Sequence, residues 1–228
     1  MGLKAAIIKR LAPYQYPQLL FAKAIIERIP RTEQQLYIAD CPCGNGEVAY
    51  HLSAAKHVSV TAVDIDVRSI ATASHNFRRP NLQFKAADIF EFLSEKKAFD
   101  LICVVNSLFL LPDQEKLFKL LHGSLNGDAA RLIIITPNPE GKNFKRFQEQ
   151  HPGVNKNVLG KNALKEKASE MQFAISEITE LEYAGYYGRR ELRLLSVFAP
   201  FYLQILNFFA KLSRQKQGNY ILYSLKKL

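Results

Sequence analysis

Short apolar runs alternate along most of the chain with segments in which apolar residues recur every three or four positions. Short runs are typical of buried strands, and the longer period is typical of amphipathic helices. The runs predict strands over Leu36–Asp40, Val58–Val63, Leu82–Ala86, Phe99–Val105, Arg131–Thr136 and Phe173–Leu181. The intervening patterns predict helices over 47–56, 67–77 and 114–125.

A further helical pattern covers residues 3–28 and breaks near Pro13 and Pro17. Proline interrupts a helix because it lacks a backbone N–H and its ring clashes with the preceding turn. Tyr14 and Tyr16 lie in this break and are candidates for a lip over a substrate pocket, although aromatic residues beside prolines more often simply pack.

Strands that alternate with helices at this spacing predict an α/β fold built from βαβ units around a parallel sheet. Such sheets bind ligands outside the carboxyl ends of their strands. Polar residues follow five successive predicted strands at that edge. They are the segment 40–46, Asp64, Asp88, Asn106 and Thr136. We interpret this convergence as the strongest functional signal in the sequence.

The turn after the first strand carries two closely spaced glycines, Gly44 and Gly46, followed by Ala49. This spacing matches the dinucleotide-binding fingerprint, and an acidic residue, Asp64, follows at the expected distance. The fingerprint alone leaves a nicotinamide-dependent enzyme open. Asp40 and Asp88 at the ends of two further strands favour another cofactor, and no separate segment supplies a hydride-transfer site.

The segment Asp40-Cys41-Pro42-Cys43-Gly44-Asn45-Gly46 resembles the D-x-G-C-G-x-G signature of class I S-adenosylmethionine-dependent methyltransferases. Val63-Asp64-Ile65-Asp66 and Ala87-Asp88-Ile89 are similar to the family's loops after its second and third strands. Pro42 departs from the pattern, because it stands where the family usually has a glycine. The resemblance covers about residues 33–140, and Tyr220–Lys226 fits the family's last strand.

The resemblance implies a doubly wound, mostly parallel, seven-stranded sheet and one domain over 1–228. Residues 1–32 and 141–228 would form caps on a cofactor-binding core over 33–140. It also implies S-adenosylmethionine as cofactor and S-adenosylhomocysteine as its product, with no metal. The implied cofactor-binding residues are Asp40, Cys41, Gly44, Gly46, Asp64, Ile65, Asp88, Ile89 and Asn106.

Each implied contact has a chemical reason. Asp40 would lie near the cationic amino or sulfonium end of the cofactor, and Asp64 would accept hydrogen bonds from both ribose hydroxyls. Ile65 would pack on adenine, and Asp88 would accept from the adenine amino group. Asp66 is expected instead to cap the following helix.

Composition narrows the cellular setting. The three cysteines, Cys41, Cys43 and Cys103, do not form a disulfide framework or a zinc spacing, which favours a reducing cytoplasm. The net charge of +10 is concentrated at the ends, because residues 1–35 carry +4, 36–140 carry −2 and 141–228 carry +8. An acidic carrier protein or an anionic membrane surface could meet these basic ends. A basic surface without any partner is an equally good interpretation.

The acceptor is the least determined feature. Asn106-Ser107-Leu108-Phe109 lacks the Asn/Asp-Pro-Pro-aromatic turn of many methyltransferases that act on amino groups. The uncharged segment 194–210 is too short and too polar for a membrane span, and could cover a pocket, a dimer face or a membrane surface. Candidate substrate residues are Tyr14, Tyr16, Phe109, Asn138, Tyr183, Tyr186, Tyr187 and Arg190. His151 is a weak candidate for a general base.

The sequence therefore predicts methyl transfer to an oxygen or carbon of a small hydrophobic or aromatic acceptor, as in quinone, lipid and polyketide-type enzymes. The alternative is an RNA methyltransferase attracted by the positive charge, but no added RNA-binding module is recognisable and the cap is apolar. A third reading is a non-catalytic subunit that binds the cofactor. We expect a cytoplasmic protein that could lie peripherally on a membrane.

Overall fold

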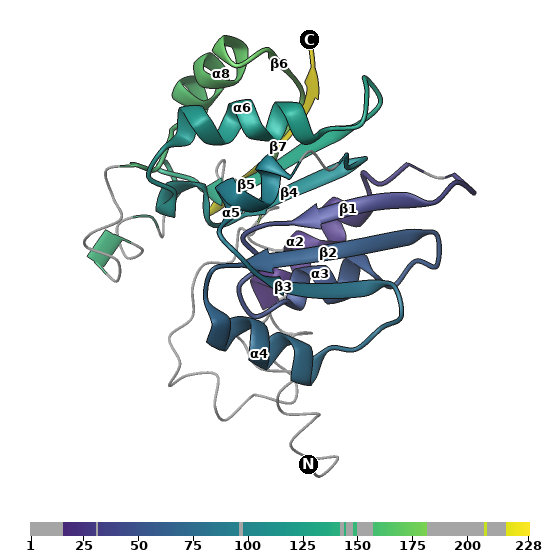
Figure 1. The fold of residues 1–228 in the computed structure, drawn as a ribbon. Helices are drawn as coiled ribbons and strands as arrows, with labels where there is room; N and C mark the ends of the chain where they lie inside the picture. The colour runs from purple at the N-terminus through teal and green to yellow at the C-terminus, as the bar shows by residue number, and fades with distance from the viewer. Residues whose placement is uncertain are drawn as a thin grey trace.

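A seven-stranded sheet organises the chain in this computed structural model, which describes residues 16–30, 32–95, 98–141, 144, 148–149, 157–181, 208 and 218–228. The strand order is β3-β2-β1-β4-β5-β7-β6, and only β7 runs against the others. Figure 1 shows this twisted sheet with β3 at one edge and helices on both faces. The strands are β1 (Leu36–Asp40), β2 (Val58–Asp64), β3 (Leu82–Ala86), β4 (Leu101–Val105), β5 (Arg131–Pro137), β6 (Phe173–Leu181) and β7 (Tyr220–Lys227).

The central strands are apolar on both faces because each face packs against helices. Successive residues of a strand point to opposite faces. In β5, Leu132 and Ile134 join one apolar cluster, whereas Ile133 and Ile135 join the other. The continuous apolar runs in the sequence therefore reflect a sheet that is buried on both sides.

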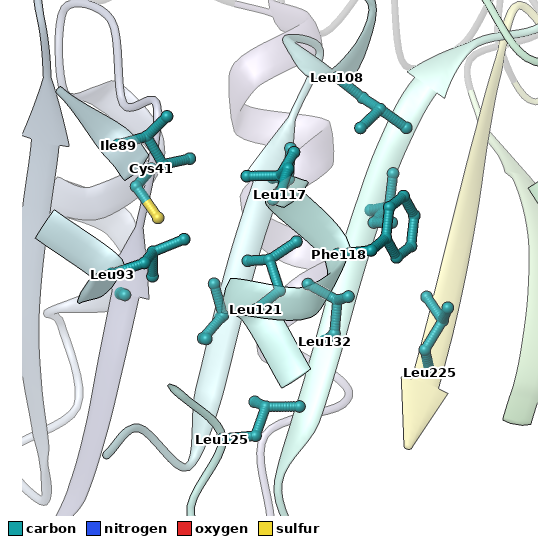
Figure 2. Packing of buried hydrophobic residues seen from close by; sticks show 14 of the residues in the cluster. Cys41, Ile89, Leu93, Leu108, Leu117, Phe118, Leu121, Leu125, Leu132 and Leu225 are labelled. Carbon is teal, nitrogen blue, oxygen red and sulfur yellow. The ribbon is translucent and has the colours of Figure 1, made fainter. Parts of the chain in front are cut away.

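Three helices cover one face of the sheet: α5 (Ile89–Ser94), α6 (Gln114–Ser124) and α8 (Lys161–Glu170). Figure 2 shows Leu117, Phe118 and Leu121 of α6 above Leu132 of β5. Burial of side chains of this size stabilises the fold by about 1.5–3 kcal/mol each. The packing therefore holds β4 and β5 rigidly at the centre of the sheet.

The opposite face is covered by α2 (Tyr16–Ile26) and α3 (Glu47–Leu52), with α4 (Val67–Asn76) towards the β3 edge. The buried residues Phe21 and Ile25 of α2 share a cluster with Val48 and Leu52 of α3. The packing of α2 against α3 thus fixes the helix that follows the glycine turn.

The predicted strands agree with the structure to within two residues at each end, but the helices differ more. The first helix among the described residues, α2, begins at Tyr16, so Pro17 lies in its first turn, where proline is tolerated, rather than in a break. The helix α3 ends at Leu52 instead of 56. The helices α5 and α8 are not predicted from the sequence, because α5 has only six residues and α8 is mostly polar.

Asp66 caps α4, as expected, and accepts a hydrogen bond from the backbone N–H of Arg68 at 3.0 Å. Asp100 directly precedes β4, and its carboxylate accepts hydrogen bonds from two neighbouring segments. It accepts from the backbone N–H of Tyr37 at 2.8 Å and from the Asn126 side chain at 3.1 Å. Asp100 therefore ties the start of β4 to β1.

A side chain that follows α2 connects this helix to β6. The Arg28 guanidinium, just after that helix, pairs with the Glu177 carboxylate and donates to the Thr179 hydroxyl at 2.9 Å. The same guanidinium donates to the carbonyl of Ala24 at 2.6 Å. This contact connects residues almost 150 positions apart and secures α2 against the sheet.

The part of the chain that the structure describes contains no helix long and apolar enough to cross a membrane. Apart from Phe208, the segment 194–210 lies outside the described residues, so its predicted role in a pocket, a dimer face or a membrane contact stays a prediction.

The contact between α2 and β6 gives the first prediction. Arg28→Ala should destabilise the fold by about 1 kcal/mol near neutral pH, since the pair is partly exposed and solvent screens it. Arg28 holds the pKa of Glu177 below its ordinary value, so this stabilisation is present above that value and is lost as the pH falls below it. Urea unfolding of the native protein and of Arg28→Ala at about pH 7 and about pH 3 measures both the loss of stability and its dependence on pH.

The exposed Lys119–Glu115 pair on α6 supplies the control. Lys119→Ala should change the free energy of unfolding much less than Arg28→Ala does. Equal effects of the two variants, or an Arg28→Ala effect that persists at low pH, would contradict the assignment.

Candidate functional site

The carboxyl ends of β1, β2 and β4 meet at one point of the sheet, where the strand order changes direction. Asp40 ends β1 and lies in register with Ala62 of β2 and Cys103 of β4. In sheets of this kind the connections leave in opposite directions at this point, which opens a crevice for a ligand.

Backbone hydrogen bonds attach the glycine turn to the end of β2. The N–H of Cys43 donates to the carbonyl of Val63 at 2.8 Å, and the N–H of Gly44 donates to Asp64 Oδ2 at 2.7 Å. The N–H of Gly46 closes the turn on the carbonyl of Cys43 at 3.0 Å. The turn is therefore held in place before any ligand binds, and its Cys41–Pro42 peptide is cis.

The two glycines serve different purposes. Both have positive φ, 53° at Gly44 and 80° at Gly46. A Cβ at Gly46 would lie 2.5 Å from Cε1 of Phe84 and 2.9 Å from Cβ of Ala73, so this glycine permits close packing within the protein. A Cβ at Gly44 would meet open space, and Gly44 is therefore the glycine that leaves room for a ligand.

Asp64 lies at the end of β2 with both carboxylate oxygens partly used. Oδ2 accepts from Gly44 and Oδ1 accepts from the backbone N–H of Asp66 at 2.9 Å. Each oxygen keeps a further lone pair for another donor. The next residue, Ile65, exposes 68% of its surface, which is unusual for a large apolar side chain and provides a flat apolar contact.

Asp88 lies just after β3 and is the N-cap residue of α5. Its Oδ1 accepts from the N–H groups of Phe90 at 2.8 Å and Glu91 at 3.2 Å. The Ile89 side chain packs into the core beneath α5. Any cofactor contact of Ile89 would therefore use its backbone. Asp88 caps α5, and its contact with the adenine amino group stays a prediction.

Asp40 is the most unusual group at this edge. It exposes 1% of its surface, and neither carboxylate oxygen has a hydrogen-bond partner among the described residues. Burial raises the pKa of Asp40 from 3.8 to about 8, and repulsion from Asp64 and Glu47 adds to the rise. The nearby backbone N–H of Ala49 lowers the pKa but does not offset burial. A buried unpaired carboxylate of this kind suits a cationic ligand.

Two further unpaired oxygens lie just beyond β4, where the N–H of Asn106 donates to the carbonyl of Ile135 at 2.7 Å. Asn106 has a φ of 51°, and its Oδ1 is buried without a partner among the described residues. The buried hydroxyl of Ser107 also has no partner there. Ser107 was not predicted from the sequence, since a lone serine in a loop carries no pattern.

The cysteines contribute packing. Cys41 and Cys103 are buried and Cys43 is partly buried, and all three are free thiols. Burial raises the pKa of each thiol well above its ordinary value, so they are poor nucleophiles. The described residues contain no cluster of three or more potential metal ligands. Cys41 can reach a cofactor only through its backbone, because its side chain lies in the core.

The predicted substrate residues have different placements. Phe109 is buried in η2 (Leu108–Leu110), directly after β4. Asn138 is also buried, and its amide is used internally, donating to the carbonyl of Gly218 at 2.7 Å and accepting from the N–H of Glu140 at 3.1 Å. The following lie outside the described residues: Tyr14, the side chain of Tyr16, His151, Tyr183, Tyr186, Tyr187 and Arg190.

Comparisons with known proteins agree with this geometry. Residues 38–128 match a family described as a methyltransferase domain. This range begins in β1 and ends just before β5, and so contains the glycine turn and the ends of β2, β3 and β4. A search of curated protein sequences found no significant match.

Several solved structures share the fold at low sequence identity. An Archaeoglobus fulgidus S-adenosylmethionine-dependent methyltransferase has a TM-score of 0.67 and 16% identity, with 92% of this chain and 94% of that chain covered. A Haloferax volcanii complex of the Trm112 methyltransferase activator with a methyltransferase has a TM-score of 0.70 and 13% identity, with 96% of this chain and 94% of that chain covered. The plantazolicin methyltransferase BpumL, bound to a monoazolic desmethyl analogue and S-adenosylhomocysteine, has a TM-score of 0.65 and 17% identity, with 98% of this chain and 88% of that chain covered.

The sheet order and the glycine turn define a Rossmann-like methyltransferase fold, and residues 38–128, which carry the glycine turn and the neighbouring strand ends, match a methyltransferase domain. The residues at the carboxyl edge fit its cofactor. The open space at Gly44, the exposed Ile65 and the unpaired buried carboxylate of Asp40 suit a ribose, an adenine ring and a cationic end respectively.

The second prediction concerns Asp64. Asp64→Ala removes the acceptor for ribose hydroxyls and also frees the N–H of Gly44, so S-adenosylhomocysteine affinity should fall by at least about tenfold. Isothermal titration measures the loss. Asp66→Ala is the matched control, because it lies two residues away and caps α4. It should lower stability and keep the affinity within about threefold. Unchanged binding by Asp64→Ala would refute the assignment.

The third prediction concerns protons. The unliganded protein holds a proton on Asp40 at pH values below about 8, whereas a cationic ligand favours the carboxylate. S-adenosylmethionine binding should therefore release close to one proton at about pH 6–7 and none above about pH 9. Its affinity should rise with pH up to about 8 and then level off.

Titrations in two buffers of different ionisation enthalpy measure this release. S-adenosylhomocysteine lacks the sulfonium charge and should release fewer protons. Asp40→Asn should abolish the release. It should also stabilise the unliganded protein, by an amount that grows from pH 3.8 to about pH 8 and then stays constant, because unfolding lets the native Asp40 ionise in this range. Proton release that survives in Asp40→Asn would assign it to another group.

Proposed function

We propose that this methyltransferase acts on an oxygen or carbon nucleophile of a small hydrophobic or aromatic acceptor. The observation that carries the proposal is the apolar exit of β4. The three residues of η2 that follow Ser107 are apolar; Leu108 and Phe109 are buried, and Leu110 exposes 58% of its surface. Apolar walls with a few unpaired polar groups are typical of small-molecule sites. Here the polar groups are Asn106 Oδ1 and the Ser107 hydroxyl.

The bound cofactor supplies a methyl group activated by a sulfonium. The chain's residues would then act mainly by alignment and by exclusion of water. Asp64 and Ile65 would hold the nucleoside end, and Asp40 would hold the cationic end. Asn106 and Ser107 lie at the end of β4, between the cofactor turn and the apolar exit, and can orient the cofactor's methionine end or a polar group of the acceptor.

No histidine among the described residues lies at the carboxyl edge. His51, His75 and His122 belong to the last turns of α3, α4 and α6, and His57 directly precedes β2. These positions lie at the amino edge, since crossover helices run back against the strands. His151 stays the candidate for a general base, and its role is a prediction.

The acceptor could be free or attached to an acidic carrier protein or a membrane surface, which would use the basic ends of the chain. The BpumL structure, in which a desmethyl analogue and S-adenosylhomocysteine are bound together, supports a small acceptor on this fold. The Haloferax volcanii complex with an activator supports a protein partner. The residues 141–217 would supply most of the substrate cap, including Tyr183, Tyr186, Tyr187 and Arg190.

The fourth prediction is the test of this proposal. With S-adenosylmethionine labelled on its methyl group, the protein should label an organic-solvent-extractable fraction of a cell extract and should leave the RNA fraction unlabelled. Leu110→Asp places a charge at the apolar exit and should raise KM for that acceptor by about tenfold or more, with cofactor affinity unchanged.

Leu110→Met is the control, because it keeps the exit apolar and of similar volume. Label that is found in nuclease-sensitive material would favour the RNA methyltransferase instead. Label in neither fraction, with the cofactor bound, would refute a small hydrophobic acceptor.

A further inference from the structure

The outer edge of β3 carries unpaired backbone groups. The N–H of Val60 donates to the carbonyl of Asn81 at 2.8 Å, and the N–H of Ala87 donates to the carbonyl of Asp64 at 3.0 Å. These bonds establish that the odd-numbered residues of β3 pair with β2. The N–H groups of Phe84 and Ala86 therefore point outwards, and the described residues supply no partner for them.

The usual protections of an edge strand are weak here. Charged side chains, especially lysine, commonly block an edge. The Lys85 side chain, however, is engaged elsewhere, since its Nζ lies 2.6 Å from Glu95 Oε1 and 5.6 Å from the centre of the Phe92 ring.

An open groove of about 450 Å³ lies beside the start of this edge, between the end of α4 and the first residues of β3, and Figure 1 shows the two elements as neighbours. Its lining contains two cations, Arg78 and Arg79, and no acidic residue. The Arg79 guanidinium lies 4.4 Å from the centre of the Tyr50 ring, and its Nε is buried without a partner among the described residues. The complete lining is Ser74, Phe77, Arg78, Arg79, Pro80, Leu82, Gln83 and Phe84.

We propose that this groove docks an extended acidic segment of a partner protein, which adds a strand to the sheet beside β3. The N–H and C=O groups of Phe84 and Ala86 would pair with the segment's backbone, and main-chain pairing of this kind provides affinity. Arg78 and Arg79 would bind its carboxylates and so select acidic segments. The proposal is independent of the acceptor that the enzyme methylates.

The groove is connected to the cofactor turn through one side chain. The Phe84 ring lies so close to Gly46 that a Cβ there would come within 2.5 Å of it, and Gly46 begins α3 directly after the turn. A segment that orders β3 and Phe84 also orders the turn. Occupancy of the groove should therefore strengthen cofactor binding by reducing the conformational freedom that the cofactor must remove.

The probe is a blocked peptide of about eight residues in which glutamate and valine alternate, a pattern that favours an extended strand. NMR of the isotope-labelled full chain should show slowed amide exchange at Phe84 and Ala86 when this peptide is added. The S-adenosylhomocysteine affinity should rise by about twofold or more at a saturating peptide concentration. A peptide with lysine in place of glutamate should not bind, and one methylated on alternate backbone nitrogens should bind at least about tenfold more weakly.

Matched variants separate the groove from general electrostatics. Arg78→Glu and the double variant Arg78→Glu/Arg79→Glu should weaken peptide binding by about tenfold or more. The double variant Lys119→Glu/Lys165→Glu, on α6 and α8, changes the net charge by the same amount as the double groove variant. It should bind the peptide nearly normally. Retained S-adenosylhomocysteine binding verifies that each variant is folded.

Three outcomes would overturn the proposal. One is peptide binding without protection of Phe84 and Ala86, and another is equal weakening by the groove and control variants. The third is salt-sensitive binding of a single-stranded oligonucleotide in the groove where the acidic peptide fails, which would assign the arginines to nucleic acid. An unchanged S-adenosylhomocysteine affinity with peptide bound would overturn the link through Phe84.

Discussion

Burial of the sheet on both faces is the constraint on which the rest of this structure depends. Leu132 and Ile134 pack against α6 and α8, while Ile133 and Ile135 pack towards α2 and α3. Because neither face can accommodate exposed polar side chains, the polar residues gather where the strands end. The functional edge of this methyltransferase is thus a consequence of how its core is covered.

At that edge the protein keeps an unfavourable group that a purely structural site would avoid. Asp40 is buried at the junction of β1, β2 and β4, and its carboxylate has no partner among the described residues. Ionising it without a cation is costly, so the empty site holds it protonated near neutral pH. A positively charged ligand beside Asp40 would offset this cost, and ligand binding, folding stability and pH would then be linked.

The two edges of the sheet are treated differently. Arg28 secures β6 to the segment after α2, whereas the outward amides of β3 have no partner among the described residues and Lys85 pairs with Glu95 instead of covering them. Phe84 then connects this open edge to Gly46 and the cofactor turn. A contact made on the outside of the sheet can therefore reach the cofactor site through a single packed aromatic ring.

The sequence by itself determined the strands and the polar residues at their carboxyl ends, because burial and backbone geometry impose such local patterns directly. It indicated the class of enzyme through the resemblance of three strand-end segments to a family, since the glycine turn alone also allowed a nicotinamide-dependent enzyme. It predicted Asp66 as a helix cap from its place before a helical pattern. It missed α5 and α8, since a six-residue helix and a mostly polar helix carry little periodicity. Only the tertiary structure separated the packing role of Gly46 from the open space at Gly44, and showed Asp40 unpaired, Ser107 unpaired and Asp100 engaged. These properties depend on which atoms surround a side chain, and residues distant in the sequence supply those atoms.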